Sequence, residues 1–227
     1  MFNIKLAGEN AIIIYFGDKI SAELVERIAF YNHLLLDKLD ELIIDVVTSY
    51  TSLMITYRIE LINHQEFCKQ VTEIVSKTNV VTISFVPDLI EIPVYYGFEV
   101  GLDLERLLIE KDLSLDEFTV LHSSKDYMVY AIGFSPAFAF LGEVDECISA
   151  SRLKTPRIQI PAGSVGIADN QTAVYPVTSS GGWNIIGRTP LDLSINNQNK
   201  IKRFSVGNRV RFTAIGKAEY LDLGGLL

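Results

Sequence analysis

The chain has 227 residues, enough for one large domain or two small ones, and its 20 Lys and Arg are outnumbered by 28 Asp and Glu. The net charge of −8 argues against binding to nucleic acid or to an anionic membrane surface, because both favour clustered basic side chains. No apolar run reaches the roughly 18 residues of a membrane-spanning helix, and residues 1–9 lack a signal-peptide pattern, so we expect a cytoplasmic protein.

Residues 1–88 alternate between strand and helix patterns. Apolar runs typical of strands cover residues 11–16, 42–47, 53–59 and 80–86. Ser21 is placed to cap a first helix, and a second helix is predicted over residues 64–76. The first helix has one apolar face, formed by Leu24, Ile28, Tyr31, Leu35 and Leu39. The order strand, helix, strand, strand, helix, strand predicts a ferredoxin-like α+β domain.

The pattern changes after Pro87 and Asp88, where we place the domain boundary. A helix is expected over residues 102–110, and the pair Ser114 and Glu117 forms a capping box for another helix that ends near His122. Short strands separated by Gly, Pro and Asn are predicted at residues 91–96, 127–134, 164–168, 172–175, 183–188 and 209–214. Asp169-Asn170 suits a tight hairpin turn between two of them. Many short strands favour a closed barrel or sandwich over residues 89–227.

The cysteines and histidines do not form a metal-binding pattern. Cys68 and Cys147 are isolated, and His33, His64 and His122 form no H-E-x-x-H or similar pair. We therefore expect no metal site and two ordinary thiols.

Two familiar catalytic motifs are also missing. Ser164 lies in an A-G-S-V-G segment that is close to a nucleophile elbow, but a strand follows it where an elbow requires a helix. No G-x-x-x-x-G-K-[ST] segment is present, so any contact with ATP must use another geometry.

Residues 134–190 contain five of the seven prolines and the single tryptophan, a density typical of binding loops or of barrel corners. Arg157 and Arg188 lie beside prolines, and each guanidinium suits a carboxylate or phosphoryl oxygen or a structural salt bridge. His122 suits a general base or a hydrogen-bond donor at a helix end.

Residues 179–182 read Ser-Ser-Gly-Gly, which fits an anion-binding nest of backbone N–H groups or a flexible turn. Trp183 follows directly. Its ring either belongs to the core or a pocket wall, or it provides a surface on which a substrate stacks.

The same region resembles the allophanate hydrolase subunit 1 family, which includes the B subunit of 5-oxoprolinase and the kinase inhibitor KipI. The matching segments are 121–123 (LHS), 133–142 (GFSPAFAFLG), 155–157 (TPR), 160–165 (IPAGSV), 171–172 (QT), 175–176 (YP) and 181–190 (GGWNIIGRTP). The resemblance is strong from about residue 91 onward and covers the first 88 residues in general layout.

The resemblance implies an α+β fold in which a ferredoxin-like domain, residues 1–88, precedes a cyclophilin-like β-barrel domain, residues 89–227. It implies that the chain works with a barrel protein similar to the C subunit (KipA-type) and with the A subunit, and that the assembly uses ATP to open 5-oxo-L-proline to L-glutamate. We predict catalytic roles for His122, Arg157 and Arg188. Arg188 is expected at the mouth of the barrel, with its side chain facing a pocket that Trp183 and His122 also line. Substrate contacts are predicted for Phe138, Gln171, Tyr175, Gly181, Gly182, Trp183 and Thr189.

The segment 133–142 departs from the family pattern G-F-x-P-G-F-x-Y-L-G-G at Ala137 and Phe140, and Glu143 follows where a glycine is expected. A residue with a Cβ at position 137 costs about 1 kcal/mol if the turn requires positive φ. We expect this segment to be a loop that leaves some of Phe134, Phe138, Phe140 and Leu141 exposed. Phe138 or Phe140 should then contact a partner or line a shared pocket. We also expect the fold to tolerate replacement of both Phe138 and Phe140 by Ala.

The family leaves two alternatives to an oxoprolinase component. One is a KipI-like inhibitor of a sensor histidine kinase, and the other is a urea carboxylase or allophanate hydrolase-related subunit. The sequence lacks a P-loop, a set of metal ligands and a nucleophile elbow. We therefore predict that the chain alone has no 5-oxoprolinase activity.

Overall fold

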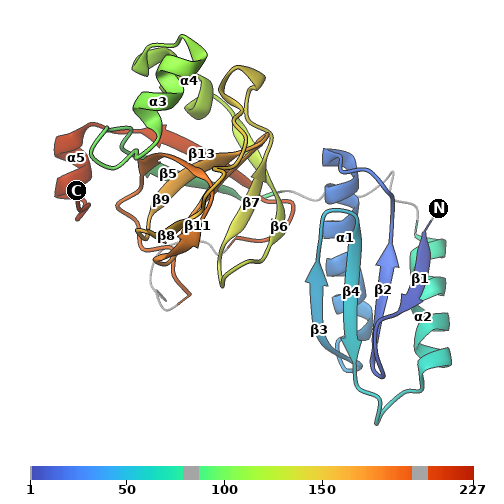
Figure 1. Ribbon diagram of the computed structural model, residues 1–227. Helices are drawn as coiled ribbons and strands as arrows, with labels where there is room; N and C mark the ends of the chain where they lie inside the picture. Colours follow the sequence, from blue (N-terminus) through green and yellow to red (C-terminus); the bar gives the residue numbers. More distant parts are fainter. Residues whose placement is uncertain (1, 79–86, 196–203) are drawn as a thin grey trace. The chain divides into compact units, whose positions relative to one another are not determined.

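The computed structural model describes residues 2–78, 87–195 and 204–227. The chain forms two compact units, Met1–Pro87 and Asp88–Leu227 (Figure 1). The division falls beside Asp88, where the sequence pattern also changes. The first unit is ferredoxin-like and the second is a cyclophilin-like barrel, so the predicted α+β fold class is confirmed.

The first unit is a four-stranded antiparallel sheet in the order β1-β2-β4-β3. Its elements are β1 (Asn3–Leu6), β2 (Ala11–Tyr15), α1 (Ala22–Leu39), β3 (Ile43–Thr48), β4 (Ser52–Tyr57) and α2 (His64–Lys77). Because β4 lies between β2 and β3, the segment β2-α1-β3 is a split βαβ unit. The strand predicted at 80–86 lies outside the described residues. The short strand β1, which was not predicted, is mostly exposed and lacks a clear alternating pattern.

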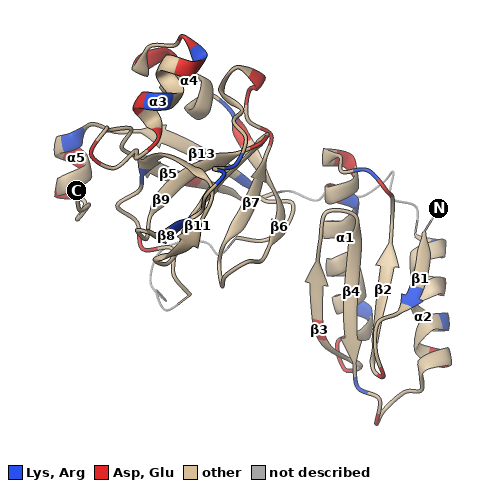
Figure 2. Cartoon of the chain, in the orientation of Figure 1, with Lys and Arg blue, Asp and Glu red and all other residues tan. Residues whose placement is uncertain are grey.

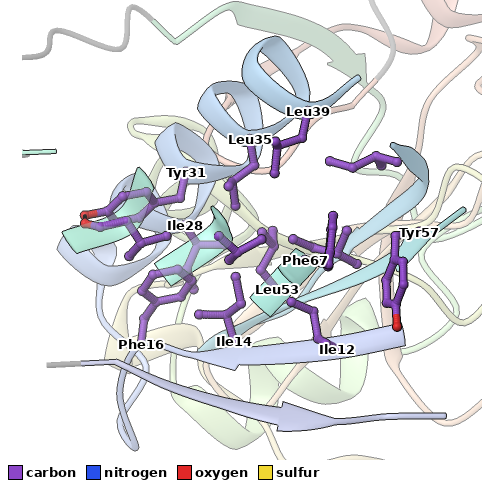
Figure 3. Packing of buried hydrophobic residues seen from close by; sticks show 14 of the residues in the cluster. Ile12, Ile14, Phe16, Ile28, Tyr31, Leu35, Leu39, Leu53, Tyr57 and Phe67 are labelled. Carbon is purple, nitrogen blue, oxygen red and sulfur yellow. Dashed lines mark hydrogen bonds between the residues drawn. The ribbon is translucent and has the colours of Figure 1, made fainter. Parts of the chain in front are cut away.

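Helices and sheet of the first unit share one apolar core (Figure 3). The hydroxyl of Ser21 accepts a hydrogen bond from the Leu24 N–H at 3.2 Å and caps α1, as predicted. All five residues of its predicted apolar face are buried, and Tyr57 of β4 stacks on Phe67 of α2 at 4.3 Å. Each such side chain contributes about 1.5–3 kcal/mol through removal from water.

The second unit is built on a seven-stranded sheet in the order β12-β9-β10-β7-β6-β13-β5. Its strands are β5 (Leu89–Val94), β6 (Asp126–Ile132), β7 (Ala139–Gly142), β9 (Ser164–Ala168), β10 (Gln171–Val174), β12 (Asn184–Arg188) and β13 (Arg209–Ala214). Tyr95, which follows β5, forms paired backbone hydrogen bonds of 2.9 and 3.0 Å with Arg188, the last residue of β12. These bonds join the two edges of the sheet, so that it is nearly closed.

Gly187 makes this closure possible. A Cβ at position 187 would lie 2.7 Å from the carbonyl oxygen of Tyr95, closer than real Cβ contacts allow. A glycine inside a strand often marks such a close approach of another backbone.

The second unit also contains α3 (Leu104–Lys111), α4 (Leu115–Ser123), a 3-10 turn η2 (Glu146–Ile148), the ribbon of β8 (Arg157–Ile160) and β11 (Ser179–Gly181), and α5 (Lys217–Asp222). The capping box of Ser114 and Glu117 is confirmed at the start of α4. The two-residue turn Asp169-Asn170 joins β9 to β10, as the sequence also predicted.

Two local predictions are corrected. Residues 139–142 form β7, which pairs with β6 on one side and β10 on the other, instead of continuing a loop. The strand was not predicted because it follows directly after the turn at Pro136. Its residues are also largely buried on both faces, so the sequence shows no alternating pattern. Residues 179–181 form β11 and pair with β8, so they are neither a nest nor a flexible turn.

The turn between β6 and β7 requires a left-handed backbone at position 137. Ala137 has φ of 66°, a conformation that glycine adopts without a steric cost and alanine does not. The departure from the family pattern at this position therefore carries the strain that the sequence predicted.

Replacing Ala137 by Gly should stabilise the barrel by about 1 kcal/mol, because the left-handed strain disappears. Urea unfolding curves of wild type and A137G measure this difference. The matched control is A139G, the same change at a buried strand position, which should destabilise the protein. A lower stability for A137G would contradict the strained-turn assignment.

Candidate functional site

Five aromatic side chains of the second unit surround a small cavity of about 120 Å³. Its lining consists of Phe134, Phe138, Phe140, Arg152, Tyr175, Gly181, Gly182 and Trp183, which we call the aromatic pocket. The aromatic residues come from the β6–β7 turn, from β7, from the residue after β10 and from the residue before β12. The fold thus brings together segments that are almost 50 residues apart in the sequence.

Phe138 is the centre of the pocket wall. It is 1% exposed, and its ring meets those of Phe134, Tyr175 and Trp183 at centroid distances of 5.2, 5.2 and 5.7 Å with near-perpendicular planes. Edge-to-face contacts of this kind are favourable beyond the area that they bury. The expectation that the fold tolerates Ala at position 138 is therefore wrong, since truncating a buried Phe costs about 3–5 kcal/mol.

The other aromatic rings of this segment differ in exposure. Phe134 is 63% exposed beside the pocket, Phe140 is partly buried, and Leu141 belongs to the core. The exposed ring expected in this segment is therefore that of Phe134.

The absence of a side chain at Gly181 leaves room for the ring of Tyr175. A Cβ at position 181 would collide with the Tyr175 hydroxyl. Burial raises the pKa of Tyr175 to about 12, although a backbone hydrogen bond from Trp183 and the charges of Arg152 and Arg157 act in the opposite direction. The phenol therefore keeps its proton at neutral pH.

Arg152 is the one charged side chain among the described residues that line the aromatic pocket. Its guanidinium lies over the indole ring of Trp183, 5.9 Å from the centroid, in a cation–π arrangement. Arg152 was not predicted from the sequence because it lies in no motif and beside no proline. Only the tertiary fold brings it to the pocket.

Arg157, a predicted catalytic residue, forms a structural ion pair. Its two terminal nitrogens donate to the two carboxylate oxygens of Asp103 at 2.8 Å each. Asp103 is 4% exposed, and the same carboxylate accepts the backbone N–H of Ile185 at 2.7 Å. The donors of Arg157 that face Asp103 are therefore already occupied, which fits the structural reading that the sequence left open.

Arg188 and Thr189 lie at a second cavity of about 180 Å³, which Tyr220 and Leu226 also line. The Arg188 guanidinium donates to the carbonyl oxygens of Ala162 at 2.8 Å and Leu226 at 3.0 Å. The Thr189 hydroxyl accepts the N–H of Leu191. These contacts hold the chain beyond β12 against the C-terminal segment.

His122 is a fully buried core residue. The Thr172 hydroxyl donates a hydrogen bond to the Gly166 carbonyl, so its oxygen accepts one from Nε2–H of His122 at 2.9 Å. On the other side of the ring, Nδ1 of His122 accepts a hydrogen bond from the Tyr96 hydroxyl at 2.7 Å. Burial lowers the pKa of His122 to about 3, and the charge of Lys125 acts in the same direction. A neutral, doubly hydrogen-bonded imidazole with no exposed surface is typical of a structural residue.

The predicted residues therefore separate into several places. Phe138, Tyr175, Gly181, Gly182 and Trp183 meet at the aromatic pocket, whereas Gln171 begins β10 and does not line it. The expectation that Arg188 faces one pocket together with Trp183 and His122 is wrong. The reason is that backbone carbonyls hold the Arg188 side chain and the His122 ring packs on Phe212 at 4.7 Å.

Within the described residues, no group of three His, Cys, Asp or Glu side chains is arranged to hold a metal ion. No helix in the described ranges is both long and apolar enough to cross a membrane.

Replacing Asp103 by Ala should destabilise the protein by about 3 kcal/mol or more, because Arg157 and the Ile185 N–H then lose their buried acceptor. Chemical unfolding measures the loss. Glu110→Gln is the control: Glu110 forms an exposed ion pair with Arg106 on α3, where charged residues lie close together (Figure 2). This variant should change the stability by less than about 1 kcal/mol. Equal effects of both variants would contradict the structural role of Asp103.

His122 should make the protein less stable in acid. Its pKa is about 3 in the fold and about 6.5 in an unfolded chain, so the unfolded state binds one more proton between these values. The contribution of the neutral ring is complete above pH 6.5 and is lost as the pH falls toward 3, with a slope of at most about 1.4 kcal/mol per pH unit. Unfolding curves measured at several pH values between about 6 and 4 give the free energy of unfolding. This free energy should fall less steeply with decreasing pH for His122→Gln than for wild type. Equal slopes would show that His122 titrates normally.

Comparisons with known proteins place this geometry in a family. Residues 2–202 match the family described as carboxyltransferase domain, subdomain C and D. The chain is 34% identical to the 5-oxoprolinase B subunit of Bacillus subtilis (strain 168), over 96% of this chain and 95% of that protein. It is 42% identical to the 5-oxoprolinase B subunit of Escherichia coli O157:H7, over 54% of this chain and 56% of that one.

Solved structures agree in fold. PH0987 from Pyrococcus horikoshii is 38% identical over 96% of this chain and all of its own, with a TM-score of 0.55. TTHA0988 is 29% identical with a TM-score of 0.77, and this chain spans 40% of its length. The Kluyveromyces lactis urea carboxylase, at 16% identity and a TM-score of 0.71, shares the fold alone. From its near full-length similarity to the Bacillus subtilis protein, the chain belongs to the family of 5-oxoprolinase B subunits.

Proposed function

We propose that this chain is the B subunit of an ATP-dependent 5-oxoprolinase, which converts 5-oxo-L-proline to L-glutamate together with partner subunits. The observation that carries the proposal is the similarity to the 5-oxoprolinase B subunit of Bacillus subtilis, which extends over 96% of this chain. The aromatic pocket is the part of the chain that we assign to the substrate.

The size and lining of the aromatic pocket suit a small ring. A volume of about 120 Å³ is well below the roughly 300–1,000 Å³ that is typical of pockets for drug-sized ligands. Phe138, Phe140 and Trp183 provide apolar walls, while Tyr175 and Arg152 provide hydrogen-bond donors. A five-membered lactam that carries one carboxylate has the same combination of an apolar ring and a polar edge.

The chain supplies binding and leaves the chemistry to an assembly. Among the residues that the structure describes, the lining of the aromatic pocket includes no carboxylate, thiol, imidazole or aliphatic hydroxyl that would serve as a base or nucleophile. The sequence has no P-loop. We therefore propose that ATP is bound by the complex with a barrel protein similar to the C subunit (KipA-type) and with the A subunit. Because a lactam carbonyl is a poor electrophile, phosphorylation of its oxygen is the expected use of ATP.

Reconstitution tests this proposal. The purified chain alone should show no ATP hydrolysis that depends on 5-oxo-L-proline, and addition of the A and C subunits should produce it together with L-glutamate. Activity of the single chain would overturn the assignment of the chemistry to partners. An assembly that forms but shows no such activity would overturn the function and favour the KipI-like alternative, which inhibition of a histidine kinase would then test.

The aromatic pocket itself is tested in the reconstituted enzyme. Trp183→Leu removes an aromatic wall and should lower kcat/KM for 5-oxo-L-proline by about tenfold or more, equivalent to about 1.4 kcal/mol. Phe98→Leu is the control, since Phe98 is 54% exposed and does not line the aromatic pocket. Circular dichroism melts confirm that both variants fold. Equal kinetics of the two variants would contradict the assignment of the pocket.

A further inference from the structure

Arg152 is held in place at the edge of the aromatic pocket by its neighbours in the sequence. The amide of Asn184 donates to the Ser151 carbonyl at 3.0 Å, and the Leu153 N–H donates to the Gly182 carbonyl at 2.8 Å. Both bonds tie the segment around Arg152 to the segment of Trp183. These bonds fix the backbone on both sides of Arg152, from which the exposed side chain extends over the indole.

The guanidinium of Arg152 still has donors to offer. Within the described residues, it takes part in no hydrogen bond or ion pair, and its contact is with the face of Trp183. Arg157 and Arg188 differ, because a buried carboxylate holds the first and two carbonyl oxygens hold the second. A guanidinium prefers a planar, two-oxygen acceptor, and a cation–π contact leaves the edge of the group free for one.

The surroundings favour an anion with an apolar body. The chain has a net charge of −8, yet none of the acidic residues in the described part of the chain lines the aromatic pocket. Tyr175 adds no negative charge, because burial raises its pKa to about 12 and the phenol stays protonated. A carboxylate at this edge thus meets a cation and no like charge among the lining residues, while an attached ring reaches the aromatic walls.

We propose that Arg152 anchors a carboxylate, so that the aromatic pocket selects small ring carboxylates over the corresponding neutral rings. This inference rests on the proposed function, in which 5-oxo-L-proline is the ligand, and assigns its carboxylate to Arg152 and its ring to Phe138 and Trp183. Arg152 is then a residue for substrate positioning and specificity and takes no part in bond breaking.

The single tryptophan of the chain provides the measurement. Trp183 fluorescence of the full chain is titrated with 5-oxo-L-proline and with 2-pyrrolidinone, the same lactam ring without the carboxylate. Arg152→Gln should weaken the affinity for 5-oxo-L-proline by about tenfold or more, because a charge-assisted contact is lost. The affinity for 2-pyrrolidinone should change by less than about twofold. Arg152→Lys should restore part of the affinity, because it keeps the charge and loses the fork.

Lys154→Gln is the matched control, since Lys154 is an exposed cation two positions away that does not line the aromatic pocket. It removes the same charge and should leave both affinities unchanged. Circular dichroism melts of the variants at position 152 check that an effect on binding is not an effect on folding. If R152Q melts early, R152K decides the matter by its relative affinity for the two ligands.

Three results would overturn the anchor: no saturable fluorescence change of wild type with 5-oxo-L-proline, equal affinity of R152Q and wild type, or an equal loss for 2-pyrrolidinone. The proposed function fails separately. If the reconstituted enzyme is inactive on 5-oxo-L-proline but wild-type chain binds a small ring carboxylate through Arg152, the anchor stands and the reaction is wrong. If the enzyme is active and R152Q has an unchanged KM, the reaction stands and the anchor is wrong.

Discussion

The buried carboxylate of Asp103 is the interaction on which the architecture around the aromatic pocket depends. One side chain, 4% exposed, accepts two hydrogen bonds from Arg157 at the start of β8 and one from the Ile185 N–H in β12. It thus ties together three segments that are distant in the sequence. A charge removed from water is stable only when its oxygens are fully used, so this position is strongly specified. Gly181 pairs with Arg157 across the β8–β11 ribbon, and Trp183 directly precedes β12, so the same tie positions two members of the pocket lining.

The barrel holds the residues that we propose for substrate binding on backbone that is fixed from several sides. Phe138 meets four aromatic rings, Gly181 leaves room for the Tyr175 hydroxyl, and hydrogen bonds on both sides of Arg152 tie its backbone to the Trp183 segment. Preorganisation of this kind lowers the entropy lost on binding, which matters for a ligand with few atoms. Among the described residues, the lining has no carboxylate, thiol, imidazole or aliphatic hydroxyl, which is why we propose that partners supply the reactive groups.

Local physics made much of the fold predictable. The apolar face and the Ser21 cap of α1, the capping box of α4 and the Asp169-Asn170 turn depend on neighbours in the sequence, and the structure contains them all. Strands β7, β8 and β11 were missed because they are short and their partners lie elsewhere in the chain. Five of the predicted substrate-contact residues meet at one pocket, yet Arg152 was overlooked and Arg157 was assigned to catalysis. Which cation is free depends on where Asp103 folds, and no spacing in the sequence encodes that.

A crystal structure of the full chain with 5-oxo-L-proline tests most directly the claim that the aromatic pocket holds the substrate. We predict the lactam ring in contact, at about 4 Å, with Phe138 and Trp183 and the carboxylate facing Arg152. Two other cavities give clear alternatives: the polar groove lined by Arg106, Lys111 and Asp169, and the cavity beside Arg188. Ligand bound in either of these, with the aromatic pocket empty, would contradict the claim.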